Sequence, residues 1–261
     1  MSVPTLTDAH LATAPYGFST QHSRAGVRNS PRSNPPMGIV FHTPGSTWAK
    51  GIWDKLPIKE PSIFEEKAAA AFDLRDYQPN YLIGVTGKIF QLDVDSNRTQ
   101  HAGKLAANAP IKTIYDSREW AKWASPSDGS GFRLHGRSPE TVYDWWFAAF
   151  PGHNSPLTVF PWKDLPNSAI GVDLLPVVDG SPSQHTTQQH EAAMWLIQSL
   201  AAMHKFKISK TTVTTHSMCS PVERGTLVSK GAIVGTPWDL PPKHFPLSTL
   251  LEKINGIKPS A

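Results

Sequence analysis

The chain has 261 residues, of which 39% are hydrophobic, so it can bury a sizeable core and is not expected to be disordered. Its single cysteine excludes an internal disulfide framework and a zinc site made of cysteines alone. The net charge is +4, but without a run of basic residues it gives no support for nucleic-acid binding. No stretch of the sequence approaches the roughly 18 consecutive apolar residues that a membrane-spanning helix needs.

The first strand of the chain carries a histidine near its end. Residues 1–36 are rich in Pro, Ser, Asn and Arg and lack periodicity, which indicates an extended N-terminal arm over the domain surface. Residues 38–43, GIVFHT, form a short apolar strand that contains His42. The later segment SIFEEKAAAAFDLRD is typical of a helix, with Ser62 as its N-cap and Glu65 three residues further on.

A β-hairpin and a long insertion come next. Residues 80–94, NYLIGVTGKIFQLDV, are typical of two strands joined by a tight turn at Thr86 and Gly87. The chain then reaches His101 in the segment QHAG. Residues 104–167 are irregular and rich in tryptophan, and ordinary connections are only roughly 4–6 residues long, so we expect an insertion lying over the core.

The C-terminal half alternates between strands and helices. Residues 168–178, SAIGVDLLPVV, are an almost continuous apolar strand interrupted by Asp173, a carboxylate that is costly to bury unless it is paired or used in chemistry. A helix with a capping box and one apolar face follows at about 186–206. The β-branched residues 211–215 form a strand, and residues 246–254 form a short closing helix.

This order of elements predicts an α/β fold with a central mixed β-sheet flanked by helices. The predicted catalytic domain spans residues 37–256 and includes the Trp-rich insertion at 104–167. The extended N-terminal arm precedes it, and residues 257–261 form a C-terminal tail. The tryptophans that could form a sugar-stacking wall or pack in the core are Trp48, Trp53, Trp145, Trp146 and Trp162.

The stretch from residue 211 to residue 242 predicts a metal site. Its strand delivers His216 onto a loop, and the loop closes on Asp239, which two prolines follow closely. A histidine at a strand end and an acid held by prolines are rigidly placed ligands, and His42 at the end of another strand supplies a third. The residue types favour Zn²⁺, and Cys219 or His244 are the alternatives to Asp239 as a ligand.

Four sequence blocks then resemble those of the zinc-dependent N-acetylmuramoyl-L-alanine amidases, a superfamily that includes the peptidoglycan recognition proteins. GIVFHT resembles the strand with the first zinc histidine, and NYLIGVTGKIFQL with QHAG resembles the hairpin and the segment after it. SAIGVDL resembles the strand that bears the catalytic glutamate, and VTTHSMCSP resembles the segment with the second zinc histidine. The blocks occur in the family's order and span about residues 37–103 and 168–242.

The resemblance implies hydrolysis of the amide between N-acetylmuramic acid and L-alanine in peptidoglycan, with His42, His216 and Asp239 as ligands of Zn²⁺. It implies a general acid–base role for Asp173 at the position of the family's glutamate, and a substrate-side role for His101. The family has a cationic residue two positions before its third ligand, where this chain has Pro237. The candidates to replace that cation are Arg224, Lys230 and Lys243.

The expected partner is peptidoglycan or its muropeptide fragments, with an immunity protein or a delivery apparatus as further candidates. The first residues contain neither a basic n-region nor an apolar h-region. We therefore expect a protein made in the cytoplasm without a signal peptide that acts on the periplasmic or extracellular cell wall as a lysis enzyme or a delivered effector. The alternatives are a non-catalytic muropeptide-binding module and a structural component of a virion or a secretion machine on the same fold.

Overall fold

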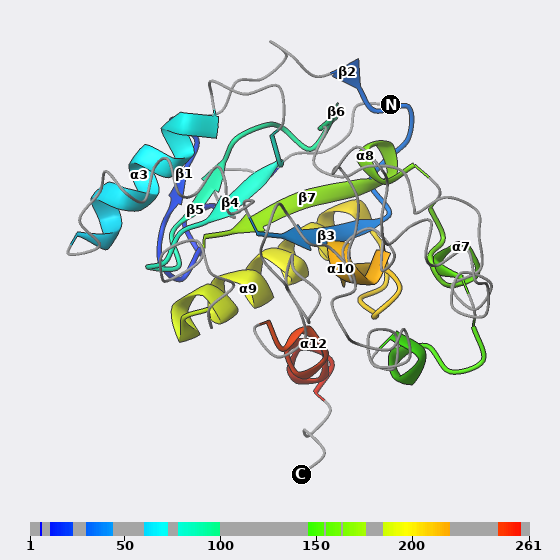
Figure 1. Ribbon diagram of the computed structural model, residues 1–261. Helices are drawn as coiled ribbons and strands as arrows, with labels where there is room; N and C mark the ends of the chain where they lie inside the picture. Colours follow the sequence, from blue (N-terminus) through cyan, green and yellow to red (C-terminus); the bar gives the residue numbers. More distant parts are fainter. Residues whose placement is uncertain are drawn as a thin grey trace, which may run out of the picture.

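A six-stranded mixed β-sheet forms the centre of the protein in the computed structural model (Figure 1). The structure describes residues 6, 11–22, 30–43, 60–72, 78–99, 146–153, 155–162, 164–175, 185–219 and 245–256. The sheet has the order β1-β5-β4-β7-β3-β8. Its strands are β1 (Phe18–Ser19), β3 (Gly38–His42), β4 (Tyr81–Ile83), β5 (Ile89–Gln91), β7 (Ala169–Leu174) and β8 (Val213–Thr215). A separate antiparallel pair joins β2 (Ser30–Pro31) to β6 (Asn97–Arg98).

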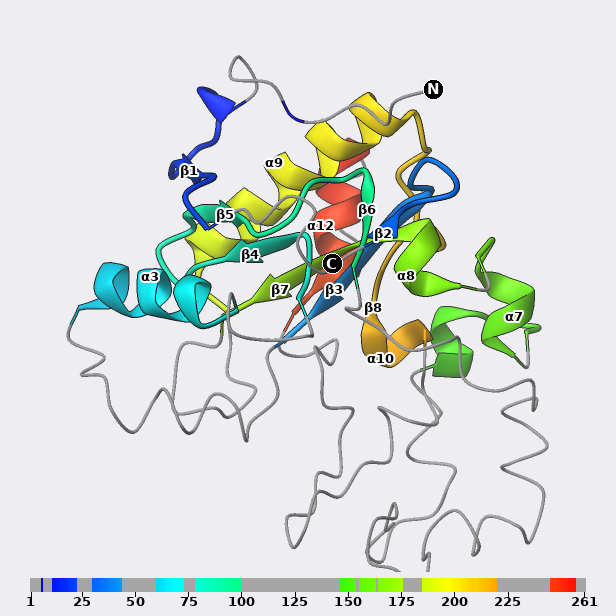
Figure 2. The ribbon, with the colours of Figure 1, turned by 90° about the horizontal axis from the view of Figure 1, so that it is seen from above.

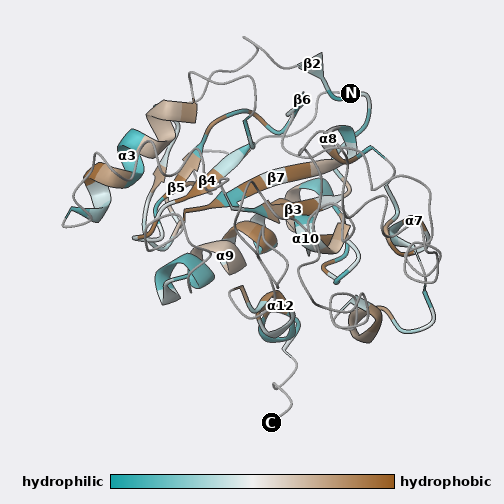
Figure 3. Cartoon of the chain, in the orientation of Figure 1, coloured by the Kyte–Doolittle hydropathy of each residue, from teal (hydrophilic) through white to brown (hydrophobic). Residues whose placement is uncertain are grey.

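The four strands β4, β7, β3 and β8 run parallel to one another, whereas β5 runs antiparallel to β4. Parallel strands that are buried on both faces have near-continuous apolar sequences. All five residues of β3 and all six of β7 are buried, and most of both strands is coloured as hydrophobic in Figure 3. This mixed sheet confirms the predicted fold class.

Helices cover both faces of the sheet. The long helix α9 (Thr187–His204) lies on one side of the sheet and α3 (Pro61–Phe72) on the other, as Figures 1 and 2 show. The closing helix α12 (Leu247–Ile254) packs against α9. Three one-turn helices are α7 (Pro156–Val159), α8 (Leu165–Ser168) and α10 (His216–Cys219). None of the helices in the described part of the chain has the length and hydropathy needed to cross a lipid bilayer.

Side chains alternate between the two faces along each strand, so the core divides into layers. Ile39 and Phe41 of β3 pack in the large cluster under α9 and α12, whereas Val40 between them packs with Trp146 and Trp162 on the other face. On that second face, α3 covers the other half of the sheet through a third cluster that includes Leu82, Phe90 and Leu92. The site described below lies on this second face.

Several predicted boundaries are confirmed. The hairpin forms with β4 antiparallel to β5, and Gly87 in its turn has a φ of +86°. Helix α9 begins with the predicted capping box, because Thr186 accepts a hydrogen bond from the N–H of Gln189 at 3.1 Å and donates its own N–H to the side chain of Gln189 at 3.0 Å. The closing helix begins at Leu247, one residue after its predicted start.

The predicted cap of α3 is wrong. The helix begins at Pro61, so Ser62 lies inside it. Glu65 is buried and does not reach back to the helix start, because its carboxylate accepts two hydrogen bonds from Thr86, one from the hydroxyl at 2.6 Å and one from the N–H at 3.1 Å. Proline is favoured at the first helical position because its missing N–H would have no intrahelical partner there and its fixed φ suits a helix, which is consistent with the earlier start.

The arm and the insertion contribute more to the domain than was predicted. Leu6 is buried in the large cluster, and β1 of the arm pairs in parallel with β5 at the edge of the sheet. The end of the insertion packs on the sheet, since Trp146 and Trp162 are buried next to Val40. These two tryptophans are therefore core residues. The other three tryptophans that were considered for a sugar-stacking wall lie outside the described residues.

Candidate metal centre

Three parallel strands end together and bring the predicted site residues to one edge of the sheet. His42 is the last residue of β3, Asp173 is the next-to-last residue of β7, and His216 follows β8 directly as the first residue of α10. In α/β sheets, ligands bind outside the carboxyl ends of the strands. The fold therefore places all three side chains where such proteins keep their sites.

The imidazoles of His42 and His216 are in contact. Their ring centres are 4.6 Å apart, and the ring planes meet at 64°. Only 4% of His42 and 1% of His216 is exposed. The contact follows from the register, in which Phe41 of β3 pairs with Thr215 of β8, so that the residue after each comes next to the other. Two histidines that are 174 positions apart in the sequence are therefore in ring contact in the fold.

Asp173 lies beside His42. The two are register partners on β7 and β3, and partners on adjacent strands point to the same face with the strands about 4.8 Å apart. Asp173 is only 7% exposed. The ends of the same two strands are tied together beyond the pair, because the hydroxyl of Thr43 donates to the carbonyl of Leu174 at 3.3 Å. The carboxylate is thus held on the same face as an imidazole, in a site that is nearly closed to solvent.

Cys219 ends the one-turn helix that His216 begins. Its side chain is fully buried in the cluster with Val40 and Trp146, and the indole N–H of Trp146 donates to the carbonyl of Met218 at 3.0 Å. Within the described ranges, no three His, Cys, Asp or Glu side chains are grouped so that they could hold a metal ion. The structure therefore does not bring Cys219 into a ligand group with the two histidines, and the same applies to Asp173.

Several predicted site residues lie outside the described residues. These are Asp239 and His244 as third ligands, His101 as a substrate-side residue, and Arg224, Lys230 and Lys243 as cations. Their roles stay predictions. What the structure shows is a ring contact between His42 and His216, with Asp173 in register beside His42.

The donor set fits a divalent metal of the zinc type. Imidazole nitrogen is a preferred ligand of zinc, and two imidazoles bound to one tetrahedral ion, each with a nitrogen about 2 Å from the metal, have ring centres about 5 Å apart. The observed 4.6 Å lies close to that value. The part of the site that the structure describes thus contains two imidazoles whose spacing is compatible with ligation of one such ion.

A further buried carboxylate lies beyond the end of β4, at the same edge of the sheet. Burial raises the pKa of Glu65, and its hydrogen bonds from Thr86 act in the opposite direction. A Cβ atom at Gly84 would lie 2.1 Å from an oxygen of this carboxylate. The sequence offered a signal for this approach, since a glycine between apolar strand residues often marks close contact with another group. The sequence pattern around Ser62 predicts a capping role for Glu65 instead.

A second titratable cluster lies at the other end of the sheet. Asp95 accepts a hydrogen bond from the hydroxyl of Tyr81 at 2.6 Å, and His204 lies 2.9 Å from its other oxygen. The side chains of Asp95 and His204 are both fully buried. Burial, with a contribution from Asp95, raises the pKa of Tyr81. The contact between Asp95 and His204 joins the last residue of α9 to the segment that follows β5.

No protein-family profile and no curated protein sequence matches this chain. Among solved structures, the chain is similar to the crystal structure of a selenomethionine derivative of AmpD. The similarity covers 78% of this chain and 86% of the AmpD chain, with 13% sequence identity and a TM-score of 0.37.

Proposed function

We propose that this protein is a zinc-dependent amidase that hydrolyses the bond between N-acetylmuramic acid and L-alanine in peptidoglycan. The observation that carries the proposal is the contact between the imidazoles of His42 and His216, with Asp173 in register beside His42. Three of the four sequence blocks that resemble the amidase family contain these same residues, which gives the contact its chemical interpretation. Zn²⁺ is the proposed cofactor, and peptidoglycan or a muropeptide is the proposed substrate.

His42 and His216 would hold the metal, and Asp239 would complete the ligand set. When bound, zinc lowers the pKa of a ligated water to about 7 and polarises the scissile carbonyl. Burial of both imidazoles excludes bulk water around them and fixes their directions, since each ring is packed at the end of a strand.

Asp173 would move the proton during hydrolysis. A carboxylate oxygen accepts the proton of the attacking water and passes it to the nitrogen of the leaving L-alanine. The aspartate is one methylene shorter than the glutamate of the family. The aspartate lies in register with His42 on the adjacent strand. His101 would orient the substrate or donate a hydrogen bond to the developing oxyanion.

The setting that we propose is the bacterial cell wall, which the protein would reach as a lysis enzyme or as a delivered effector. This part of the proposal rests on the sequence, in which the N-terminal arm and the insertion exceed what a minimal muropeptide-recycling enzyme needs. Interaction with an immunity protein or a delivery apparatus belongs to the same proposal.

The test is hydrolysis of purified peptidoglycan, measured as new N-terminal L-alanine. We expect activity from the zinc-loaded protein and a loss of at least about 1,000-fold in the variant His216→Ala, because the open metal site is lost with the ligand. The matched control is His153→Ala, which removes an exposed histidine. If the wild type binds muropeptides but releases no L-alanine N-termini, the protein is a non-catalytic binding module.

A further inference from the structure

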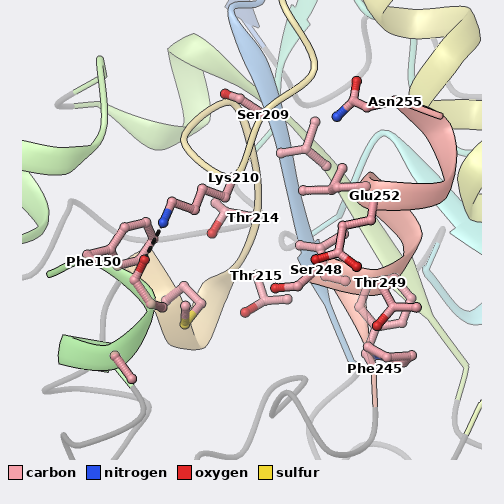
Figure 4. A pocket seen from close by; sticks show the side chains of 17 residues that line it. Phe150, Ser209, Lys210, Thr214, Thr215, Phe245, Ser248, Thr249, Glu252 and Asn255 are labelled. Atoms are coloured by element: carbon pink, nitrogen blue, oxygen red, sulfur yellow. Dashed lines mark hydrogen bonds between the residues drawn. The ribbon is translucent and has the colours of Figure 1, made fainter. Parts of the chain in front are cut away.

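The outer edge of β8 opens into a groove of about 560 Å³ (Figure 4). β8 is the last strand of the sheet, since β3 lies on one side of it and no strand of the described chain lies on the other. The groove is lined by β8, by α12 and by residues 148–150. Its volume lies within the range of about 300–1,000 Å³ that is usual for ligand sites.

The backbone of β8 presents hydrogen-bonding groups to this groove. The N–H of Ile39 donates to the carbonyl of Thr212, and the parallel register then directs the N–H and carbonyl of Thr214 to β3 as well. The backbone groups of Val213 and Thr215 therefore face outward. The N–H of Val213 donates to the carbonyl of Ser209 at 2.8 Å, whereas the carbonyl of Val213 and the N–H of Thr215 have no hydrogen-bond partner among the described residues.

The two walls of the groove continue the two layers that cover the sheet. Leu247 and Leu251 of α12 belong to the layer under α9, and Phe150 and Met218 belong to the layer on the opposite face. The groove therefore lies where the next strand of the sheet would lie, between the same two layers that cover the other strands. An acceptor and a donor that face outward from β8 are the groups with which an added strand pairs. β8 is three residues long, or about 10 Å, which suits a peptide of about three to four residues.

The charges in the groove favour a cationic ligand. Lys210 on one wall is already engaged, because its ammonium group donates to the carbonyl of Ala149 and lies 5.2 Å from the ring centre of Phe150. Glu252 on the α12 wall is half-buried and has no hydrogen-bond or ion-pair partner among the described residues. Its carboxylate is therefore the charge that a ligand can neutralise.

We propose that this groove binds an extended peptide of about three to four residues, which pairs with the outer edge of β8 and places a cationic side chain against Glu252. This site is distinct from the proposed metal centre and does not depend on amidase activity. The groove and the proposed metal centre are adjacent along the chain, since Thr215 lines the groove and the next residue is His216.

The test uses a fluorescein-labelled tetrapeptide, Val-Lys-Val-Thr, blocked at both ends, and measures its binding by fluorescence polarisation. We expect saturable binding to the full chain. N-methylation of the peptide amides removes the donors that pair with β8 and should weaken binding at least about tenfold. Replacing the lysine of the peptide by glutamate should weaken binding by a similar factor. Equal binding of the N-methylated and unmodified peptides would overturn the proposal, and this comparison needs no protein variant.

Protein variants test the contact between the carboxylate of Glu252 and the lysine of the peptide. Glu252→Gln should weaken binding of the lysine peptide about tenfold and leave binding of a glutamine version of the peptide unchanged. The control Lys253→Gln changes an exposed residue of the same helix that does not line the groove, and it should bind as the wild type does. Unchanged binding of the lysine peptide by Glu252→Gln would contradict the proposed contact. Absence of saturable peptide binding would also overturn the proposal, and a doubled mass in sedimentation would then make a second copy of the chain the candidate occupant of the groove.

Discussion

His42 of β3 and Asp173 of β7 are register partners at the carboxyl end of the sheet. Their side chains share one face, and that face is apolar on both sides of them. Val40 and Trp146 belong to the cluster on one side, and Leu82 and Phe90 belong to the cluster under α3 on the other. A carboxylate and an imidazole are thus held next to each other in surroundings from which bulk water is largely excluded, which strengthens electrostatic interactions between them.

The role of Asp173 can be separated from metal binding by the substitution Asp173→Asn, which keeps the size of the side chain. If the carboxylate only moves the proton, kcat/KM should fall about 100- to 10,000-fold while the zinc content stays unchanged. Asp173→Glu restores a carboxylate of the length found in the resembling family and should recover part of the rate. Loss of zinc from Asp173→Asn would instead identify this residue as a ligand.

Gly84 is required by the close approach of Glu65. In Gly84→Ala, the new methyl group would lie 2.1 Å from the carboxylate, so the variant should lose about 1–3 kcal/mol of unfolding free energy in urea. Glu65→Ala removes the clash together with the hydrogen bonds to Thr86. The double variant should therefore be more stable than the sum of the two single losses predicts. Additive losses would show that the two residues do not interact.

The capping box of α9 gives a prediction for Thr186. Its hydroxyl accepts from the N–H of Gln189 and also donates to the carbonyl of Val85 at 2.9 Å, so it joins the helix start to the hairpin. Thr186→Ala should cost about 1–2 kcal/mol of unfolding free energy. Thr187→Ala, at an exposed position of the same turn, should stay within about 0.5 kcal/mol of the wild type. Equal effects of both substitutions would contradict the capping role.

His190 should make stability depend on pH. Burial and then the charge of Lys253 lower the pKa of His190 in the folded protein, whereas in the unfolded chain it is about 6.5. Between these two values the unfolded chain binds more protons, so the contribution of the neutral ring is complete above about pH 6.5 and is lost as the pH falls through the folded pKa.

The measurement for His190 is urea unfolding at about pH 7.5 and about pH 5.5. His190→Gln should lose less unfolding free energy between these pH values than the wild type does, and the control His153→Gln, at an exposed histidine, should behave as the wild type. An identical pH dependence in His190→Gln and the wild type would show that burial of this imidazole does not affect its proton affinity.

Local sequence patterns predicted the parts of the fold that depend on neighbouring residues. The capping box of α9, the hairpin with its turn at Gly87 and the apolar strand around Asp173 all lie where the patterns placed them. Each of these depends on hydrogen bonds or alternation within about 15 residues. The sequence also predicted that His42 and His216 end two strands, and their ring contact is the consequence of placing those strands side by side.

Features that depend on distant partners could not be predicted in this way. Glu65 has the sequence position of a capping residue, and only the hairpin turn that lies next to α3 in space gives its carboxylate a better partner in Thr86. The pairing of Phe18 with Ile89, which brings the arm into the sheet, has no local signal because β1 is only two residues long. The same limit applies to the predicted third ligand, since residues between regular elements have no periodic pattern that fixes their place.

The most direct test of the metal centre is the stoichiometry and affinity of zinc in the purified protein, measured by mass spectrometry of the metal and by competition with a chelator. The account predicts one zinc ion per chain, with affinity reduced at least about 100-fold in both His42→Ala and His216→Ala and unchanged in His153→Ala. An apoprotein that binds no zinc, or zinc binding that survives loss of either histidine, would contradict the account.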